Sequence, residues 1–305
     1  MEKESLLTET STDLPNNVIQ NGRFVFSSTK SLKSTIEELE KVELEIVQKN
    51  FESKYEEGFR SYKPIVSSDN LELQTQLSKE ITLKQEQKGT SKGTDEQDDL
   101  ISDPLLAAFV NDNNEIIVND SLYKIVDDQG VLIVHVKDTT YLYDYLKNQS
   151  KTSKISSRAA SDCGGYQQMD DRITLFIAPI DDCGSGGGYS GGGSSGGSSS
   201  PIVDPEIKLQ DIIANLQNCD INKSFFQNLF GKSYSCTENF DSSHRIKTEF
   251  WDQSWGFYKS AGILTKTQTK TLGIWWESNS DEIHMGINKI LLKYKVPAPQ
   301  ILLNH

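Results

Sequence analysis

The chain has 305 residues, of which 35% are hydrophobic, and a formal net charge of −13. The acidic excess lies in residues 1–200, whereas residues 201–305 contain eleven acidic and eleven basic side chains. This distribution offers no basic stripe for a phosphate backbone, so it argues against nucleic-acid binding. The sequence also contains no run of about 18 apolar residues, the length that a membrane-spanning helix needs.

The first hundred residues predict a tether, a strand and a long helix. Residues 1–20 are polar and show no apolar periodicity, which is typical of a flexible tether, and a strand is expected at Arg23–Ser27. Ser34 lies three residues before Glu37, a spacing that favours a helix N-cap. A single amphipathic helix is expected after it, because one face carries residues at spacings of three and four. These residues are Ile36, Leu39, Glu43, Val47, Phe51, Tyr55 and Phe59.

Residues 69–148 predict helices around a small β-meander. A weak helical pattern from residue 69 decays into a loop at about 85–100, which we expect to be mobile. A short helix is expected at Leu105–Val110, followed by strands within 115–126 and 131–136. The predicted turns are Asn119-Asp120 and Asp128-Gln129-Gly130. A helix from residue 139 is then expected to pack Tyr141, Leu142 and Tyr145 over the meander.

A glycine-rich tract follows the strand predicted at Arg172–Ile180, which Pro179 ends. Nine glycines and seven serines fill residues 184–200, so residues 183–201 are interpreted as a linker. The tract contains a formal match to the dinucleotide-binding glycine pattern. That pattern needs a strand directly before it and a helix directly after it, so the match is attributed to composition.

Residues 202–305 predict a C-terminal antiparallel β domain. A helix is expected at residues 204–218, and the segment from there to Cys236 shows no regular pattern. Aromatic and β-branched residues then alternate with polar ones in the runs 244–253, 255–278 and 282–296, which predicts four or five strands. The fold class predicted for the whole chain is α+β. Residues 21–182 form its N-terminal helix and hairpin region.

Four cysteines lie in the second half of the chain, and no two of them are close enough for a zinc or redox pair. One or two disulfides are therefore favoured over reduced thiols, and three pairings are possible. Cys163–Cys183 together with Cys219–Cys236 is the simplest.

Four tryptophans within twenty-six residues are the least ordinary feature of the chain. Indole rings serve either a β core or a recognition surface. Because neighbours on a strand point to opposite faces, either Trp275 or Trp276 is expected at a surface. The candidate ligand-binding residues are Trp251, Trp255, Trp275, Trp276 and Tyr258.

Carboxylates near histidines give an alternative, a hydrolase site. Glu249 or Asp252 would act with His244 or His284, although residues three apart on a strand face opposite sides. The same histidines with Asp241 and Glu249 would suit a metal on adjacent strands, but surface histidines are the favoured interpretation. No catalytic spacing is present, so a non-enzyme without metal or cofactor is favoured.

Several segments resemble a group of uncharacterised exported proteins of Bacteroidota-type bacteria. They are "NGRFVFSSTKSLKSTIEELEKVE", "GFRSYKPIV", "DPLLAAFVNDNNEIIVNDSLYKI" and "FYKSAGILTKTQTKTLGIWWES". The resemblance implies a lipoprotein-like protein of the cell envelope or cell surface, held by an N-terminal lipid anchor. This chain begins Met1-Glu2-Lys3 without the anchor cysteine. If Met1 stands in its place, residues 1–20 are the stalk; if Met1 is native, reduced cysteines are expected instead.

These observations favour a non-catalytic envelope protein that binds a protein, peptide or glycan through its aromatic β domain. The alternatives are the envelope hydrolase and a structural assembly component, which would show a large apolar patch.

Overall fold

The computed structural model describes residues 18–87, 100–127, 129–149, 164–179, 227–283 and 285. Met1–Ser194 and Cys219–Ser280 form one compact unit, and this unit holds nearly all of the described residues. Ser195–Asn218 and Asp281–His305 form a second unit. The predicted helix at 204–218 and the run after residue 285 lie outside the described residues, as do the predicted boundaries at 182 and 202.

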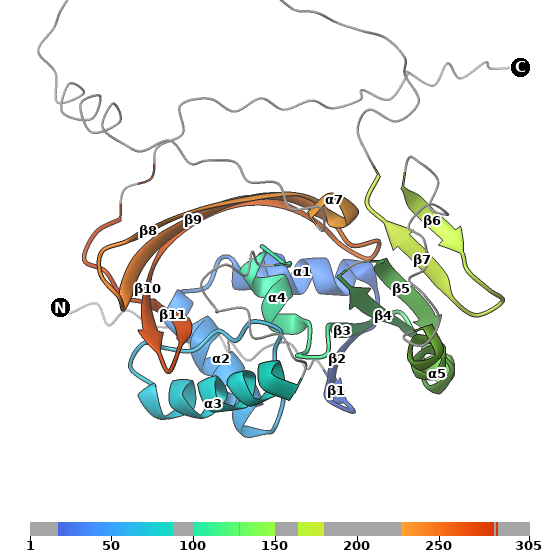
Figure 1. The fold of residues 1–305 in the computed structure, drawn as a ribbon, viewed down its shortest axis with the longest axis horizontal. Helices are drawn as coiled ribbons and strands as arrows, with labels where there is room; N and C mark the ends of the chain where they lie inside the picture. The colour runs from blue at the N-terminus through green and yellow to red at the C-terminus, as the bar shows by residue number, and fades with distance from the viewer. Residues whose placement is uncertain are drawn as a thin grey trace, which may run out of the picture. The chain divides into compact units, whose positions relative to one another are not determined.

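The first unit contains helices, a mixed seven-stranded sheet and a four-stranded antiparallel sheet, as expected for an α+β protein (Figure 1). The larger sheet has the order β1-β2-β3-β4-β5-β7-β6, and only the pair β2 and β3 is parallel. Its strands are β1 (Val18–Gln20), β2 (Arg23–Phe26), β3 (Glu115–Val118), β4 (Ser121–Val126), β5 (Gly130–His135), β6 (Gly165–Gln168) and β7 (Thr174–Ile177).

The predicted β-meander is the centre of this sheet, because β3, β4 and β5 pair in chain order. Asn119 and Asp120 join β3 to β4 with φ angles of 50° and 58°. Two consecutive positive φ angles are the geometry of a type I′ hairpin turn, which Asn and Asp tolerate. The tight turn predicted at this dipeptide is confirmed.

Seven helical segments are present among the described residues. They are α1 (Thr29–Leu39), α2 (Leu44–Glu56), α3 (Leu71–Gln87), α4 (Pro104–Phe109), the 3-10 turn η1 (Val136–Asp138), α5 (Thr139–Gln149) and α7 (Gln227–Phe230). The short helix predicted near Leu105 is therefore confirmed as α4. The Asp103 side chain caps it by accepting hydrogen bonds from the backbone N–H groups of Leu105 and Leu106.

The single long helix predicted from Ser34 is wrong, since two helices, α1 and α2, occupy this segment. The N-cap of α1 is Ser28, whose hydroxyl accepts from the backbone N–H of Ser31 at 3.1 Å. The break coincides with Glu43, the one charged residue on the apolar face, which becomes the N-cap of α2. The apolar residues predicted on that face are all buried. The buried face was thus correctly predicted, but the division of the segment into two helices was not.

Three strands lie where none was predicted. Val18–Gln20, assigned to the tether, form β1, and the turn that follows has positive φ at Asn21 and Gly22. Asn-Gly is a strong hairpin signal, so this strand could have been found. β6 was not foreseen either, and the segment expected to be irregular before Cys236 contains β8 (Gly231–Asn239).

The smaller sheet has the order β11-β10-β9-β8 and is antiparallel throughout. Its other strands are β9 (His244–Ser254), β10 (Lys259–Thr271) and β11 (Ile274–Ser278). The long strands β8, β9 and β10 curve over α1 and α4 (Figure 1). We call the face of this sheet that the rest of the unit covers its inner face.

One hydrophobic core extends through the unit and includes residues from both predicted domains. Phe24, Phe51 and Phe109 are fully buried and belong to the same core cluster as Trp255 and Phe257, which lie in the connection between β9 and β10. Hydrogen bonds also join the two parts: the Gln253 side chain accepts from the backbone N–H of Ser102 at 3.0 Å and donates to the Leu100 carbonyl at 2.9 Å. The smaller sheet therefore packs directly against the N-terminal helices.

The predicted packing of α5 is only partly right. Leu142 is fully buried and Tyr145 is half-buried, but Tyr141 is exposed. Its hydroxyl donates to the Asp170 carboxylate at 3.0 Å, and the Arg172 guanidinium lies 4.8 Å from its ring centroid. A polar partner at the surface thus holds the ring there. Within the described part of the chain, no helix is long and apolar enough to cross a membrane.

Candidate functional site

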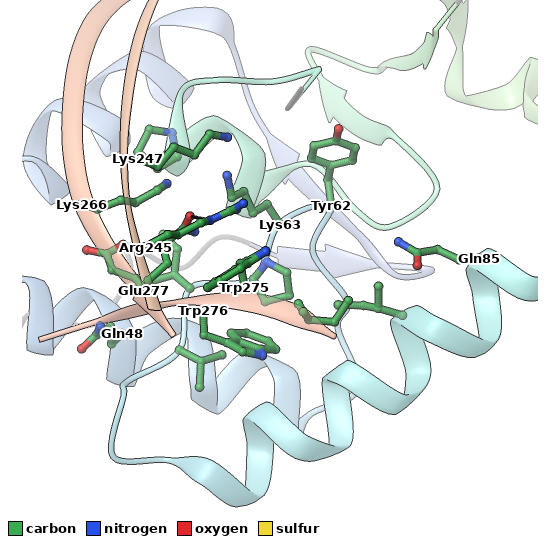
Figure 2. A pocket seen from close by; sticks show the side chains of 17 residues that line it. Gln48, Tyr62, Lys63, Gln85, Arg245, Lys247, Lys266, Trp275, Trp276 and Glu277 are labelled. Atoms are coloured by element: carbon green, nitrogen blue, oxygen red, sulfur yellow. Dashed lines mark hydrogen bonds between the residues drawn. The ribbon is translucent and has the colours of Figure 1, made fainter. Parts of the chain in front are cut away.

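A cavity of about 160 Å³ lies between the inner face of the smaller sheet and the helices it covers (Figure 2). The sheet contributes residues of β9, β10 and β11, and the opposite wall comes from α2, α3, the segment between them and the first residue of α4. We call this space the sheet–helix cavity. Its lining residues are Gln48, Tyr62, Lys63, Pro64, Ile65, Val66, Ile81, Gln85, Pro104, Arg245, Lys247, Lys266, Gln268, Ile274, Trp275, Trp276 and Glu277.

Strand alternation places charged residues on this inner face. Successive side chains of a strand point to opposite faces, and in β9 every second residue from Arg245 to Gln253 is buried. Arg245, Lys247 and Glu249 are therefore covered by the helices. His244 and Asp252 lie on the exposed face of the same strand. Burial of such charges is costly unless they are paired.

Glu249 pairs with both buried lysines. Its carboxylate oxygens lie 2.9 Å from the Lys247 ammonium and 3.1 Å from that of Lys266. These three residues are only 2%, 6% and 5% exposed. Lys247 and Lys266 are direct cross-strand partners, a position at which like charges repel. Glu249 thus bridges two cations, and the cluster retains one net positive charge.

Arg245 extends this charged face toward β11. Its Nε donates to the Gln268 side chain at 2.8 Å, and its guanidinium lies 4.2 Å from the ring centroid of Trp275. The Lys270 ammonium lies 5.0 Å from the same ring. Cations so placed are attracted to the electron-rich face of an indole. The side chains of Arg245, Lys247 and Lys266 extend from their strands toward Lys63 (Figure 2).

The helix side of the cavity is more apolar. Pro64, Ile65 and Ile81 line it together with the ring of Tyr62. Lys63 adds a further cation, and Gln48 and Gln85 add amide groups from α2 and α3. The cavity thus joins a cationic wall to a wall that is largely apolar, with Trp275 on the sheet side between them (Figure 2).

The predicted tryptophan cluster is divided by the structure. Trp275 is half-buried and lines the cavity. Trp276 also lines it, but it is 4% exposed, and its indole N–H donates to the Ser78 hydroxyl of α3 at 3.0 Å. Trp255 is fully buried and stacks on Phe230 with ring centroids 4.7 Å apart. The four rings therefore do not form one surface.

Trp251 connects the smaller sheet to the start of α4. Its indole N–H donates to the Ser260 hydroxyl at 2.8 Å, which in turn donates to the Asp103 carboxylate at 2.6 Å. The Trp251 ring packs on Gly262, where an added Cβ would lie 2.4 Å from the ring. Tyr258 is half-buried near the same group, and burial, with the Asp103 charge as the next cause, raises the pKa of its hydroxyl.

The groups of the alternative hydrolase site lie apart. Glu249 faces the helices, whereas His244 and Asp252 lie on the exposed face and are eight positions apart, a separation of about 26 Å along a strand. The His244 ring contacts the Asp241 carboxylate at 2.9 Å. The hydrogen bond from the Ser243 backbone N–H and then this contact lower the pKa of Asp241 to about 2. His284 lies outside the described residues. Among the residues described here, no three His, Cys, Asp or Glu side chains gather as metal ligands would.

The cysteine predictions are largely outside the described residues. Cys236 lies on β8, but Cys163, Cys183 and Cys219 belong to segments that the structure does not describe. The pairing of the four cysteines therefore stays a prediction.

Sequence reasoning missed the cationic wall of the cavity. Arg245 and Lys247 were not singled out in the sequence, and Glu249 was considered only as a hydrolase carboxylate, although the three alternate at the period of two that marks one face. Trp251 shares this face, whereas Ile246 and Phe250 lie on the other. Apolar residues thus stand on both faces, so the pattern alone does not say which face is covered. The covering segment, around Lys63, is remote in sequence.

No family model matches the chain, and neither a curated protein nor a solved structure matches it.

Proposed function

We propose that this chain is a non-catalytic binding protein that takes an anionic group of its partner into the sheet–helix cavity. The observation that carries the proposal is the cationic wall, in which Arg245, Lys247 and Lys266 face Lys63 across the cavity. The proposal keeps the predicted role of the smaller sheet as the binding element. It replaces the tryptophan cluster by a single tryptophan, Trp275, set among cations.

The local charge differs from that of the chain as a whole. The lining contains four basic side chains and one acidic one, Glu277, in a chain with a net charge of −13. The adjoining Glu249 brings the acidic groups to two. A concave site lined by one sign of charge concentrates ligands of the opposite sign, so an acidic group of a peptide, glycan or small molecule fits this cavity.

A binding role is favoured over the alternative hydrolase because no acid–base pair meets at the cavity. Glu249 is held between two lysines, and no histidine is among the described residues that line the cavity. General acid–base catalysis needs a group within hydrogen-bond reach of the proton that it transfers. The described geometry offers no such pair beside the cavity.

The proposal can be tested with four small anions as probes: glucuronate, benzoate, phenyl sulfate and phenyl phosphate. Titration calorimetry at constant ionic strength should detect binding of at least one of them. Arg245→Gln should weaken that binding about tenfold or more, because it removes a charge from the wall. Added salt should weaken it as well, since salt screens electrostatic attraction.

Lys259→Gln is the matched control, because Lys259 is an exposed cation on the outer face of β10. It removes the same charge from the chain and should leave binding unchanged. Circular dichroism would establish that both variants fold. If none of the four anions binds, or if both variants bind equally well, the proposed function is wrong.

The cell-envelope location predicted from the sequence is part of this proposal. A count of free thiols in natively produced protein tests it. Paired cysteines support an oxidising compartment, and four free thiols contradict it.

A further inference from the structure

We propose that the cationic end of the sheet–helix cavity is a subsite for the phosphomonoester group of a small molecule that carries one ring. This inference rests on the proposed function and specifies its ligand class. It comes from three features of the cavity: its charge, the facing lysines and its size.

The charge of the cavity matches a dianion. Four basic side chains, Arg245, Lys247, Lys266 and Lys63, stand against the carboxylates of Glu249 and Glu277, an excess of two positive charges. A phosphomonoester carries about 1.5 to 2 negative charges at pH 7. A carboxylate or a sulfate ester carries one. Only the phosphomonoester therefore offsets the excess with a single group.

The lysine pair explains why a dianion would bind at the cationic end of the cavity. Lys247 and Lys266 are direct cross-strand partners and both are almost fully buried, so their repulsion is poorly screened. Glu249 holds both ammonium groups within 3.1 Å of its oxygens, which keeps them close together. A bound dianion offsets the net positive charge that remains on the lysine pair after Glu249 has neutralised one of the two ammonium groups. Arg245, two register pairs along, adds a planar fork suited to phosphate oxygens.

Size and the opposite wall indicate the rest of the ligand. A volume of about 160 Å³ is close to that of a cavity that holds benzene, roughly 150 Å³. It accommodates a single ring rather than a chain of residues. The apolar side chains of Pro64, Ile65 and Ile81, with Trp275, provide the surface for that ring. The cavity therefore favours a small ring-bearing molecule over a peptide segment.

Phenyl phosphate and phenyl sulfate form a test pair of nearly equal shape. The phosphate gains its second negative charge near pH 6, whereas the sulfate ester stays singly charged. Calorimetry should show phenyl phosphate binding about tenfold more tightly at pH 7.5 than at pH 5, and about tenfold more tightly than phenyl sulfate at pH 7.5. The affinity for phenyl sulfate should change less than threefold over this range.

The comparison of phenyl phosphate with phenyl sulfate also controls for the titration of protein groups that face the subsite. Arg245, Lys247 and Glu249 face it from β9, Lys266 from β10, Glu277 from β11, and Tyr62 and Lys63 from the segment after α2. Lys270 of β10 lies beside the Trp275 ring. Any titration of these groups changes the binding of both probes. A pH dependence confined to phenyl phosphate therefore belongs to the ligand.

The lysines are tested separately by Lys247→Met and Lys266→Met. Each should weaken phenyl phosphate about tenfold and phenyl sulfate about threefold or less, because a dianion loses more attraction than a monoanion. Lys259→Met is the control on the outer face and should change neither affinity. Glucose 6-phosphate, titrated beside phenyl phosphate, then distinguishes a sugar ring from an aryl ring.

The outcomes separate the two proposals. If phenyl phosphate and phenyl sulfate bind equally well, and Arg245→Gln weakens both, the phosphate subsite is wrong while the proposed function stands. If no probe binds, both fail. If a phosphotyrosine hexapeptide binds tenfold more tightly than both phenyl phosphate and glucose 6-phosphate, the small-molecule class is wrong.

Discussion

The aromatic cluster beside the larger sheet and the inner face of β9 and β10 are both buried, and α2 contributes to each, with Phe51 in the cluster and Gln48 at the cavity, but their chemistry is opposite. In the aromatic cluster Phe24 contacts Phe51, Phe59 and Phe109, with ring centroids 4.6 to 6.4 Å apart. On the inner face of β9 and β10, charged side chains occupy comparable depth. Burial of apolar rings stabilises a fold without further requirement. Buried charges need partners, and Glu249 is the partner of both buried lysines.

The largest expected effect is on the aromatic side of this comparison. Phe109→Ala removes a fully buried ring that packs against Phe24, Phe26 and Phe51. It should lower the free energy of unfolding by about 3–5 kcal/mol, measured by urea denaturation. Binding of the small anions should be unchanged in the protein that remains folded. A loss below about 1 kcal/mol would show that this cluster is not the centre of the core.

Glu249→Gln tests the charged side. It leaves Lys247 and Lys266 facing each other without the carboxylate that bridges them, and loss of one partner of a buried pair costs about 3–5 kcal/mol. Saturating phenyl phosphate should restore part of the melting temperature, since a bound anion offsets the same charges. An unchanged unfolding free energy would contradict the bridging role of Glu249.

Acid should lower the free energy of unfolding through Glu115, a buried carboxylate at the start of β3. Burial alone raises the pKa of its carboxyl, but the hydrogen bond from Tyr143 and the charges of Lys124 and Arg23 outweigh burial and lower it. The Tyr143 hydroxyl and the Arg23 Nε each lie 2.7 Å from a carboxylate oxygen.

A lowered pKa means that the folded state holds the proton less tightly than the unfolded state, where the pKa of a Glu is about 4.3. The stabilisation is therefore complete above that pH and is lost as the pH falls through the lower folded pKa. Unfolding free energies between pH 7 and pH 3 should fall more steeply in the wild type than in Glu115→Gln. Parallel curves would contradict this.

The smallest effect is expected for Lys266→Met. The substitution removes one of two like charges and leaves Lys247 and Glu249 as a neutral pair, so the unfolding free energy should change by less than about 1 kcal/mol. Because the same variant should weaken phenyl phosphate about tenfold, it separates binding from stability. A large destabilisation would mean that this lysine is chiefly structural.

The sequence was sufficient for elements whose signals are local. The meander was found because Asn119-Asp120 requires a turn, and α4 because its apolar run is short and bounded. β1 was missed although Asn21-Gly22 carries an equally local signal. The break between α1 and α2 was overlooked because Glu43 was treated as an interruption of one helix rather than as the N-cap of a second.

The cavity could not be predicted in the same way. Period two shows that Arg245, Lys247 and Glu249 share a face, but not that α2, α3 and Lys63 cover it. That covering depends on contacts between segments about 180 residues apart. The tryptophan prediction met the same obstacle, since burial of Trp251 and Trp255 depends on Ser260, Asp103 and Phe230, which the local pattern does not reveal.

The close packing of Trp251 on Gly262 has a consequence for sequence variation. Any side chain at 262 would overlap the indole, displace it from Ser260 and break the hydrogen-bond chain to Asp103. Positions 251 and 262 should accordingly covary: an orthologue that replaces the glycine should also carry a smaller residue in place of the tryptophan.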